Sequence, residues 1–138
     1  MNRKMLYLLL PVLTLALPAC RTARLVNPAP IAAATSQAAT HEAILVAMKR
    51  QDWVATTDAP GVVHAERNIS NKHHMWVAIS YDDSSVSLEY QNSRNLRYER
   101  FESGREVIHR NYLVWIRQLM WSIRTEIATS RRDSKPPA

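Results

Sequence analysis

The sequence predicts a small α+β domain with a short N-terminal helix, a four-stranded antiparallel β-meander and a long C-terminal helix packed on one sheet face. Two changes of period predict this order. Apolar residues repeat at helical spacing after residue 40, alternate with polar residues until residue 91, and return to helical spacing after residue 105. Without residues 1–19, the 138-residue chain retains about 119 residues, which suits one domain with a single core.

The chain begins with a predicted signal peptide at residues 1–19. Arg3 and Lys4 precede an apolar run that ends at Ala19. This run is shorter than the roughly 20 apolar residues that a membrane span needs. We therefore expect the protein to be exported.

Cys20 is the only cysteine, and it follows the small residue Ala19 in the pattern of bacterial lipoproteins. In that pattern the thiol receives a diacylglycerol and the cysteine becomes the new N-terminus. We expect a lipid on Cys20 that holds the protein in a membrane. The alternative is an ordinary signal peptide cleaved nearby, which leaves an unpaired thiol. Arg21, where an aspartate would favour the inner membrane, indicates the periplasmic face of the outer membrane.

Composition divides the rest of the chain into three parts. Residues 20–39 are rich in alanine, proline, serine and threonine and show no lasting period, so we expect a flexible, lipid-anchored linker. Residues 40–129 form the predicted domain. Residues 130–138 contain two prolines and three basic residues and are predicted to be a disordered basic tail.

The first predicted helix begins with Thr40 as its cap and ends near Gln51. A β-prone run at 53–57 follows, and the turn sequence Asp58–Gly61 leads into a hairpin. Three further runs alternate apolar and polar residues between short polar turns, so their apolar sides should face a helix. These apolar positions are Val63, Ala65, Met75, Val77, Ile79, Val86, Leu88 and Tyr90.

The long helix is predicted to begin at Ser103, because Ser103 and Glu106 have the spacing of a capping box. Its apolar residues form one broad stripe, which suits packing across a sheet. The stripe contains Ile108, Tyr112, Trp115, Ile116, Leu119, Met120, Ile123 and Ile127.

Two large apolar residues of the long helix lie opposite that stripe. Val114 and Trp121 are seven residues apart, and Arg110, Arg117 and Arg124 lie in the neighbouring row at the same spacing. An aromatic ring beside arginines is typical of a partner-binding surface. The alternative is that the linker or a loop covers Trp121.

Charge and residue spacing exclude several function classes. The net charge is +6, but residues 41–130 contain 11 basic and 11 acidic residues, so the basic excess lies on the flanks. We therefore expect no nucleic-acid partner, and instead attraction to anionic lipid or cell-wall polymer. His73 and His74 are adjacent in a predicted strand and point to opposite faces, so no metal site is expected. The chain has only two glycines, and we expect no cofactor.

Four sequence blocks stand out in the predicted domain. They are Gly61–Ala65, Val77–Asp82, Tyr90–Leu96, and Ile108–Tyr112 followed by Trp115 and Ile116. Together they resemble a group of small uncharacterised lipoproteins of Proteobacteria, over a span from Ile44 to Ile127. The resemblance implies export and lipidation and brings no assigned activity. Leu113 departs from the pattern, since similar sequences tend to have a second asparagine there, and the connection 97–105 is longer than usual.

A polar cluster lies beside these departures and consists of Ser93, Asn95, His109, Asn111 and Tyr112. Such a cluster either ties the exit of a strand to the start of a helix or forms a site for a small ligand or a hydrolase. No glycine pattern of a nucleophile elbow accompanies it. We expect a non-catalytic envelope module that binds a protein or a cell-wall polymer, with the ligand or hydrolase site as the alternative. An exposed sheet edge would also allow a homodimer.

Overall fold

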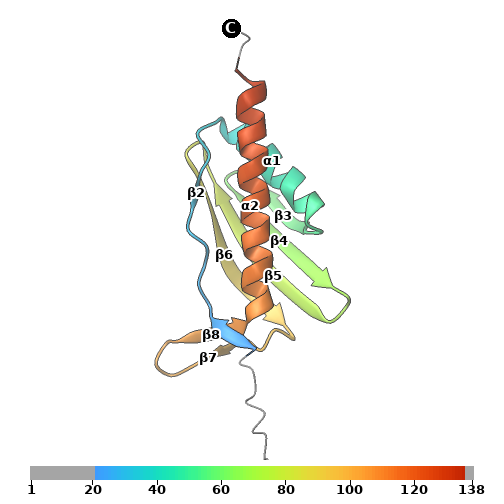
Figure 1. Ribbon diagram of the computed structural model, residues 1–138, viewed down its shortest axis with the longest axis vertical. Helices are drawn as coiled ribbons and strands as arrows, with labels where there is room; N and C mark the ends of the chain where they lie inside the picture. The colour runs from blue at the N-terminus through green and yellow to red at the C-terminus, as the bar shows by residue number, and fades with distance from the viewer. Residues whose placement is uncertain (1–20, 136–138) are drawn as a thin grey trace, which may run out of the picture.

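Residues 21–135 are described by a computed structural model, in which two helices cover one face of a five-stranded antiparallel sheet (Figure 1). A second sheet of three strands lies at the N-terminal end of α2, the helix Arg110–Asp133. The α+β class and the long C-terminal helix predicted from the sequence are confirmed. The predicted signal peptide at 1–19 and Cys20 lie outside the described residues.

The larger sheet contains four long strands that follow one another in the chain. They are β3 (Val54–Ala59), β4 (Val62–Ile69), β5 (His73–Tyr81) and β6 (Ser85–Arg94). A fifth strand, β2 (Ile31–Ala32), pairs with β6 and completes the order β2-β6-β5-β4-β3. The expected four-stranded meander is therefore corrected to five strands. A two-residue strand shows no alternation along the sequence, so the pattern missed it.

One face of this sheet forms half of the core. Val63, Met75 and Leu88, together with the other apolar residues that alternate with them, are buried beneath the helices, as expected. Tyr90 is half-buried. All six residues of β3 are exposed at the sheet edge, and this edge is available for the homodimer pairing that the sequence allows.

The first helix, α1 (Gln37–Arg50), begins earlier than the sequence predicts. Ser36 is its cap, and the Ser36 hydroxyl accepts a hydrogen bond from the backbone N–H of Ala39 at 3.1 Å. Thr40 lies buried within the helix and donates its hydroxyl to the carbonyl of Ser36 at 3.0 Å. Gln51 ends the helix, as expected.

The start of α2 also differs from the prediction. The segment expected to be the first helical turn is instead β8 (Glu106–His109), which pairs with β7 (Glu99–Arg100). Gly104 adopts φ +80° in the turn between them. The positive φ at Gly104 and the pairing of β8 prevent Ser103 from capping a helix, and His109 is the cap.

The expected flexible linker is wrong for residues 22–33. β1 (Thr22–Arg24) pairs with β8, β2 pairs with β6, and Ile31 and Ala33 are buried. In a free linker the backbone N–H and C=O groups would be hydrogen-bonded to water, whereas here those of β1 and β2 pair with two sheet edges. The apolar side chains of Ile31 and Ala33 are stabilised by burial in the core. At the other end α2 continues to Asp133, so residues 130–133 of the expected tail are helical.

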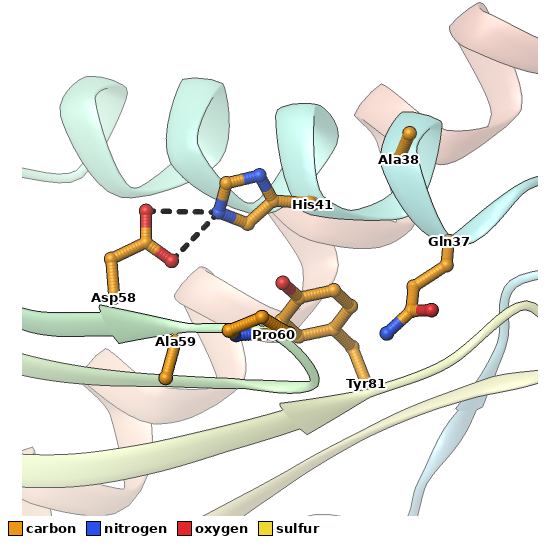
Figure 2. A pocket seen from close by; sticks show the side chains of 7 residues that line it. All are labelled: Gln37, Ala38, His41, Asp58, Ala59, Pro60 and Tyr81. Atoms are coloured by element: carbon orange, nitrogen blue, oxygen red, sulfur yellow. Dashed lines mark hydrogen bonds and ion pairs between the residues drawn. The ribbon is translucent and has the colours of Figure 1, made fainter.

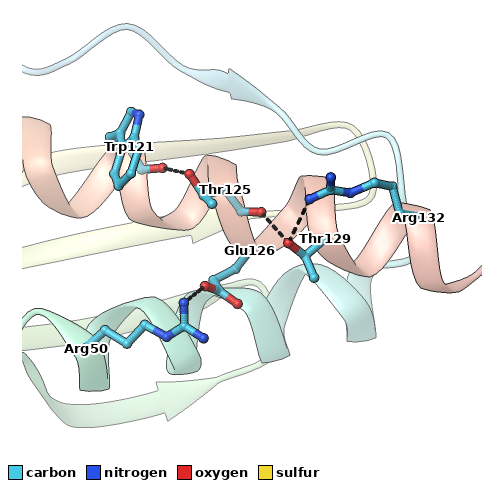
Figure 3. Close-up of polar contacts among 6 residues, drawn as sticks. All are labelled: Arg50, Trp121, Thr125, Glu126, Thr129 and Arg132. Atoms are coloured by element: carbon cyan, nitrogen blue, oxygen red, sulfur yellow. Dashed lines mark hydrogen bonds and ion pairs between the residues drawn. The ribbon is translucent and has the colours of Figure 1, made fainter.

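The apolar stripe of the long helix packs as predicted. Tyr112, Ile116, Leu119, Met120, Ile123 and Ile127 are buried, whereas Trp115 is half-buried. Ile108 is buried too, although it belongs to β8. Burial of such a side chain contributes about 1.5 to 3 kcal/mol before entropy is subtracted. Arg50 of α1 and Glu126 of α2 form an ion pair between the two helices (Figure 3).

Candidate functional site

The outward side of α2, which we call the helix back, carries the largest exposed aromatic ring in the described chain. Trp121 is 67% exposed and Val114 is 40% exposed. In Figure 3 the Trp121 ring projects from α2 on the side away from α1. The helical period places both residues opposite the buried stripe, so their exposure follows from the packing of α2 on the sheet.

The alternative that the linker or a loop covers Trp121 is contradicted by the exposure of its ring. The extended chain between β1 and β2 does run along α2, where Val26, Asn27 and Pro28 line a cavity of about 270 Å³ with Leu113 and Arg117. This cavity lies beside the row that contains Trp121, and the indole itself stays exposed.

The three predicted arginines of the helix back, Arg110, Arg117 and Arg124, are all exposed. The Arg117 guanidinium donates through Nε to the carbonyl of Leu113 at 3.0 Å, which lays this side chain along the helix. The nearest acidic residue of the helix, Glu126, is turned toward Arg50 of α1 (Figure 3). The helix back therefore combines an aromatic ring with positive charge.

The polar cluster is brought together only in part, and its hydrogen bonds are mostly structural. The Ser93 hydroxyl shares a hydrogen bond with the Tyr90 hydroxyl at 2.9 Å. The Asn95 amide donates to the carbonyl of Lys72 at 2.8 Å, and the Asn95 carbonyl contacts Nδ1 of His73 at 2.9 Å. Asn95 adopts φ +58°, so it shapes the exit from β6.

His109 and Asn111 form the start of α2. Nδ1 of His109 accepts a hydrogen bond from the backbone N–H of Asn111 at 3.2 Å. Desolvation, followed by the nearby His73 and Arg97, lowers the pKa of His109. A neutral ring suits the cap, because only the unprotonated Nδ1 accepts a hydrogen bond.

Tyr112 is the member of the cluster with a buried polar atom that has no hydrogen-bond partner. Its ring is buried, and it meets Tyr90 edge-on at 5.5 Å between centroids. The Tyr112 hydroxyl is buried without a hydrogen bond. Burial raises the pKa of Tyr112 well above its ordinary value, so the phenol stays protonated. These contacts favour the structural interpretation of the cluster over a ligand site.

His73 and His74, the adjacent pair of β5, have different neighbours. His73 lies near His109 and Trp115, whereas His74 pairs with Glu66 at 3.1 Å and stacks on Trp76. Within residues 21–135, no group of three or more His, Cys, Asp or Glu side chains is placed to hold a metal ion.

The sequence patterns missed a cavity between α1 and the β3–β4 turn. It has a volume of about 420 Å³, and its polar residues include His41, Asp58 and Tyr81 (Figure 2). Nε2 of His41 lies 2.8 and 3.0 Å from the two Asp58 carboxylate oxygens, and the His41 ring stacks on Tyr81. Gln37, Ala38, Ala59 and Pro60 complete the lining, which contains no serine, threonine or cysteine nucleophile. His41 and Asp58 are 17 residues apart, and no local motif joins them.

Comparison with known proteins adds no identification. No protein-family model, no curated protein and no solved structure matches this chain. Among residues 21–135, no helix is both long and apolar enough to cross a membrane.

Proposed function

We propose that this chain is a non-catalytic binding module of the bacterial cell envelope. A lipid on Cys20 holds it at the periplasmic face of the outer membrane, and the helix back binds an envelope protein or a cell-wall polymer. The observation that carries the proposal is the 67% exposure of Trp121 beside a row of exposed arginines. The lipoprotein sequence pattern and the family resemblance support the anchor.

The chemistry of the helix back explains why it suits a partner. An exposed indole leaves apolar surface in water, and its burial in an interface is favourable. Tryptophan and arginine are the residue types that dominate binding energy at interfaces, because the ring packs and the guanidinium donates several hydrogen bonds. Arg117 and Arg124 flank the ring, so an acidic or carbonyl-rich partner surface fits best.

Support for a small-ligand binder or hydrolase at Ser93, Asn95 and His109 is weaker. The hydrogen bonds of these three residues hold Tyr90, the carbonyl of Lys72 and the start of α2. Catalysis by His109 as a general base needs an unprotonated nitrogen that is free to accept a proton. Because Nδ1 accepts the hydrogen bond of the helix cap, the neutral ring carries its proton on Nε2 and has no free lone pair.

The test of the helix back uses the full chain in its own membrane, with a photo-crosslinking residue at Gln118 of α2. The expected result is a crosslinked envelope species that disappears in Trp121→Ala and persists in Val54→Ala, a matched control at another exposed apolar residue. Both variants should keep the thermal midpoint of the wild type. Retention of the crosslink in Trp121→Ala would show that the helix back is not the binding surface.

The test of the anchor is mass spectrometry of the mature protein from fractionated membranes, compared with Cys20→Ala. A diacylglycerol on Cys20 in the outer membrane is expected. An unmodified chain in the soluble periplasmic fraction would overturn the anchored module and make a diffusible binder the better hypothesis.

A further inference from the structure

The chain enters the fold directly at the small sheet. The backbone N–H of Arg110 donates to the carbonyl of Arg21 at 2.9 Å, and the N–H of Leu25 donates to the carbonyl of Glu106 at 2.9 Å. β1 lies between these two hydrogen bonds and pairs with β8. Cys20 immediately precedes Arg21 in the sequence, so no flexible linker separates the proposed lipid from the folded domain.

This end of the molecule also holds the net charge. Residues 21–24 and 94–110, which include the small sheet, its connections, the last residue of β6 and the first residue of α2, contain seven arginines and three glutamates, a net charge of +4. The other residues between 25 and 135 contain nine basic and nine acidic residues, a net charge of zero. β1 and the helix start meet at one end of α2 in Figure 1, so the charge excess is concentrated there. We call this part of the molecule the anchor end.

The hairpin β7–β8 of the anchor end adds aromatic rings to this charge. Tyr98 is 39% exposed, and its hydroxyl donates to Glu106 at 2.6 Å. The Arg105 guanidinium lies 4.3 Å from the centre of the Phe101 ring. Aromatic rings beside arginines are typical of the headgroup region of a membrane, where the ring meets the apolar boundary and the guanidinium meets phosphate.

We infer that the anchor end docks on the anionic phospholipid headgroups of the membrane that holds the Cys20 lipid. The inference rests on the proposed acylation of Cys20. The two acyl chains of the diacylglycerol attach the chain to the membrane, and the basic surface beside them determines which end of the domain faces the headgroups. Trp121 is 11 residues from Arg110, which corresponds to about 17 Å along the helix from the anchor end. α2 then carries the partner-binding ring clear of the headgroups.

The experiment uses the full acylated protein reconstituted in vesicles that contain phosphatidylglycerol. A photo-crosslinking residue replaces Ser103, at the tip of the β7–β8 hairpin, or Asp83, an exposed residue in the β5–β6 turn at the opposite end. The expected result is crosslinking to lipid from position 103 and not from position 83. Vesicles of phosphatidylcholine alone, or high salt, should reduce the yield at position 103.

Charge-matched variants separate local docking from overall charge. The pair Arg97→Gln and Arg100→Gln should lower the ratio of docked to undocked protein about 30-fold, at roughly fivefold for each arginine. The pair Arg131→Gln and Arg132→Gln removes the same charge at the far end of α2 and should leave the ratio within about twofold. Equal lipid crosslinking from both positions of an acylated protein would overturn this inference alone. An unmodified Cys20 would overturn the proposed anchor together with it.

Discussion

The five-stranded sheet packs one face against two helices, whereas the three-stranded sheet β1-β8-β7 has short strands and a single fully buried residue, Ile108. The net positive charge of the described chain lies at the anchor end, which contains the smaller sheet, and the remaining residues have no net charge. The two sheets therefore contribute to the fold in different ways. Apolar burial beneath the helices supplies most of the stability, while the small sheet joins the chain start to the start of α2 through backbone hydrogen bonds.

The largest expected effect is in the core of the larger sheet. Ile123→Ala should lower the free energy of unfolding by about 2 to 5 kcal/mol, because it removes buried methyl groups and leaves a cavity. Urea denaturation measures the loss, with Val54→Ala as an exposed control expected within about 0.5 kcal/mol of wild type. A loss below that of the control variant would contradict the assignment of stability to this core.

A smaller effect is expected where the two sheets meet. His109→Ala should lower the free energy of unfolding by about 1 kcal/mol, because the N–H of Asn111 loses its acceptor. His109→Asn provides the matched control, since an asparagine side chain also accepts at a helix start. Equal losses in the two variants would mean that the ring contacts with His73, and not the cap, are what His109 contributes.

The smallest effect is a pH dependence at the same junction. Desolvation, followed by the electrostatic effects of His73 and of Arg97, Arg21 and Arg110, holds the folded-state pKa of His109 below 6.5. At a pH between the two pKa values, the unfolded chain therefore binds more protons at His109 than the folded chain does. The stabilising contribution is complete above pH 6.5 and is lost as the pH falls from there through the lower, folded-state value.

The measurement is the free energy of unfolding against pH for wild type and His109→Asn. As the pH falls below about 6.5, the free energy of unfolding of wild type should decrease more than that of His109→Asn. The contributions of the other titrating groups cancel in this difference. Parallel curves would show that His109 titrates equally in the folded and unfolded chain.

Much of the larger sheet follows from local sequence pattern. The alternation in residues 62–90 predicts β4, β5, β6 and their buried side, and the helical stripe predicts which side of α2 is buried. The position of Trp121 opposite the buried stripe follows from the same helical period, whereas its exposure was left open by the sequence and is shown by the structure. The cavity of His41 and Asp58 could not be predicted from the sequence, because the two residues belong to a helix and a strand that no sequence motif connects.

The sequence by itself determined the class of the fold, the strands β4, β5 and β6 and the two faces of α2, because each of these elements has enough residues to display a period. Only the tertiary structure decided the small sheet, where Thr22 pairs with His109 across most of the chain. Strands of two to four residues are too short to display a clear period, and their hydrogen bonds exist only when the partner edge is in place. That pairing also joined Arg21 and Arg24 to the arginines of residues 94–110, so a charge spread along the sequence became a surface.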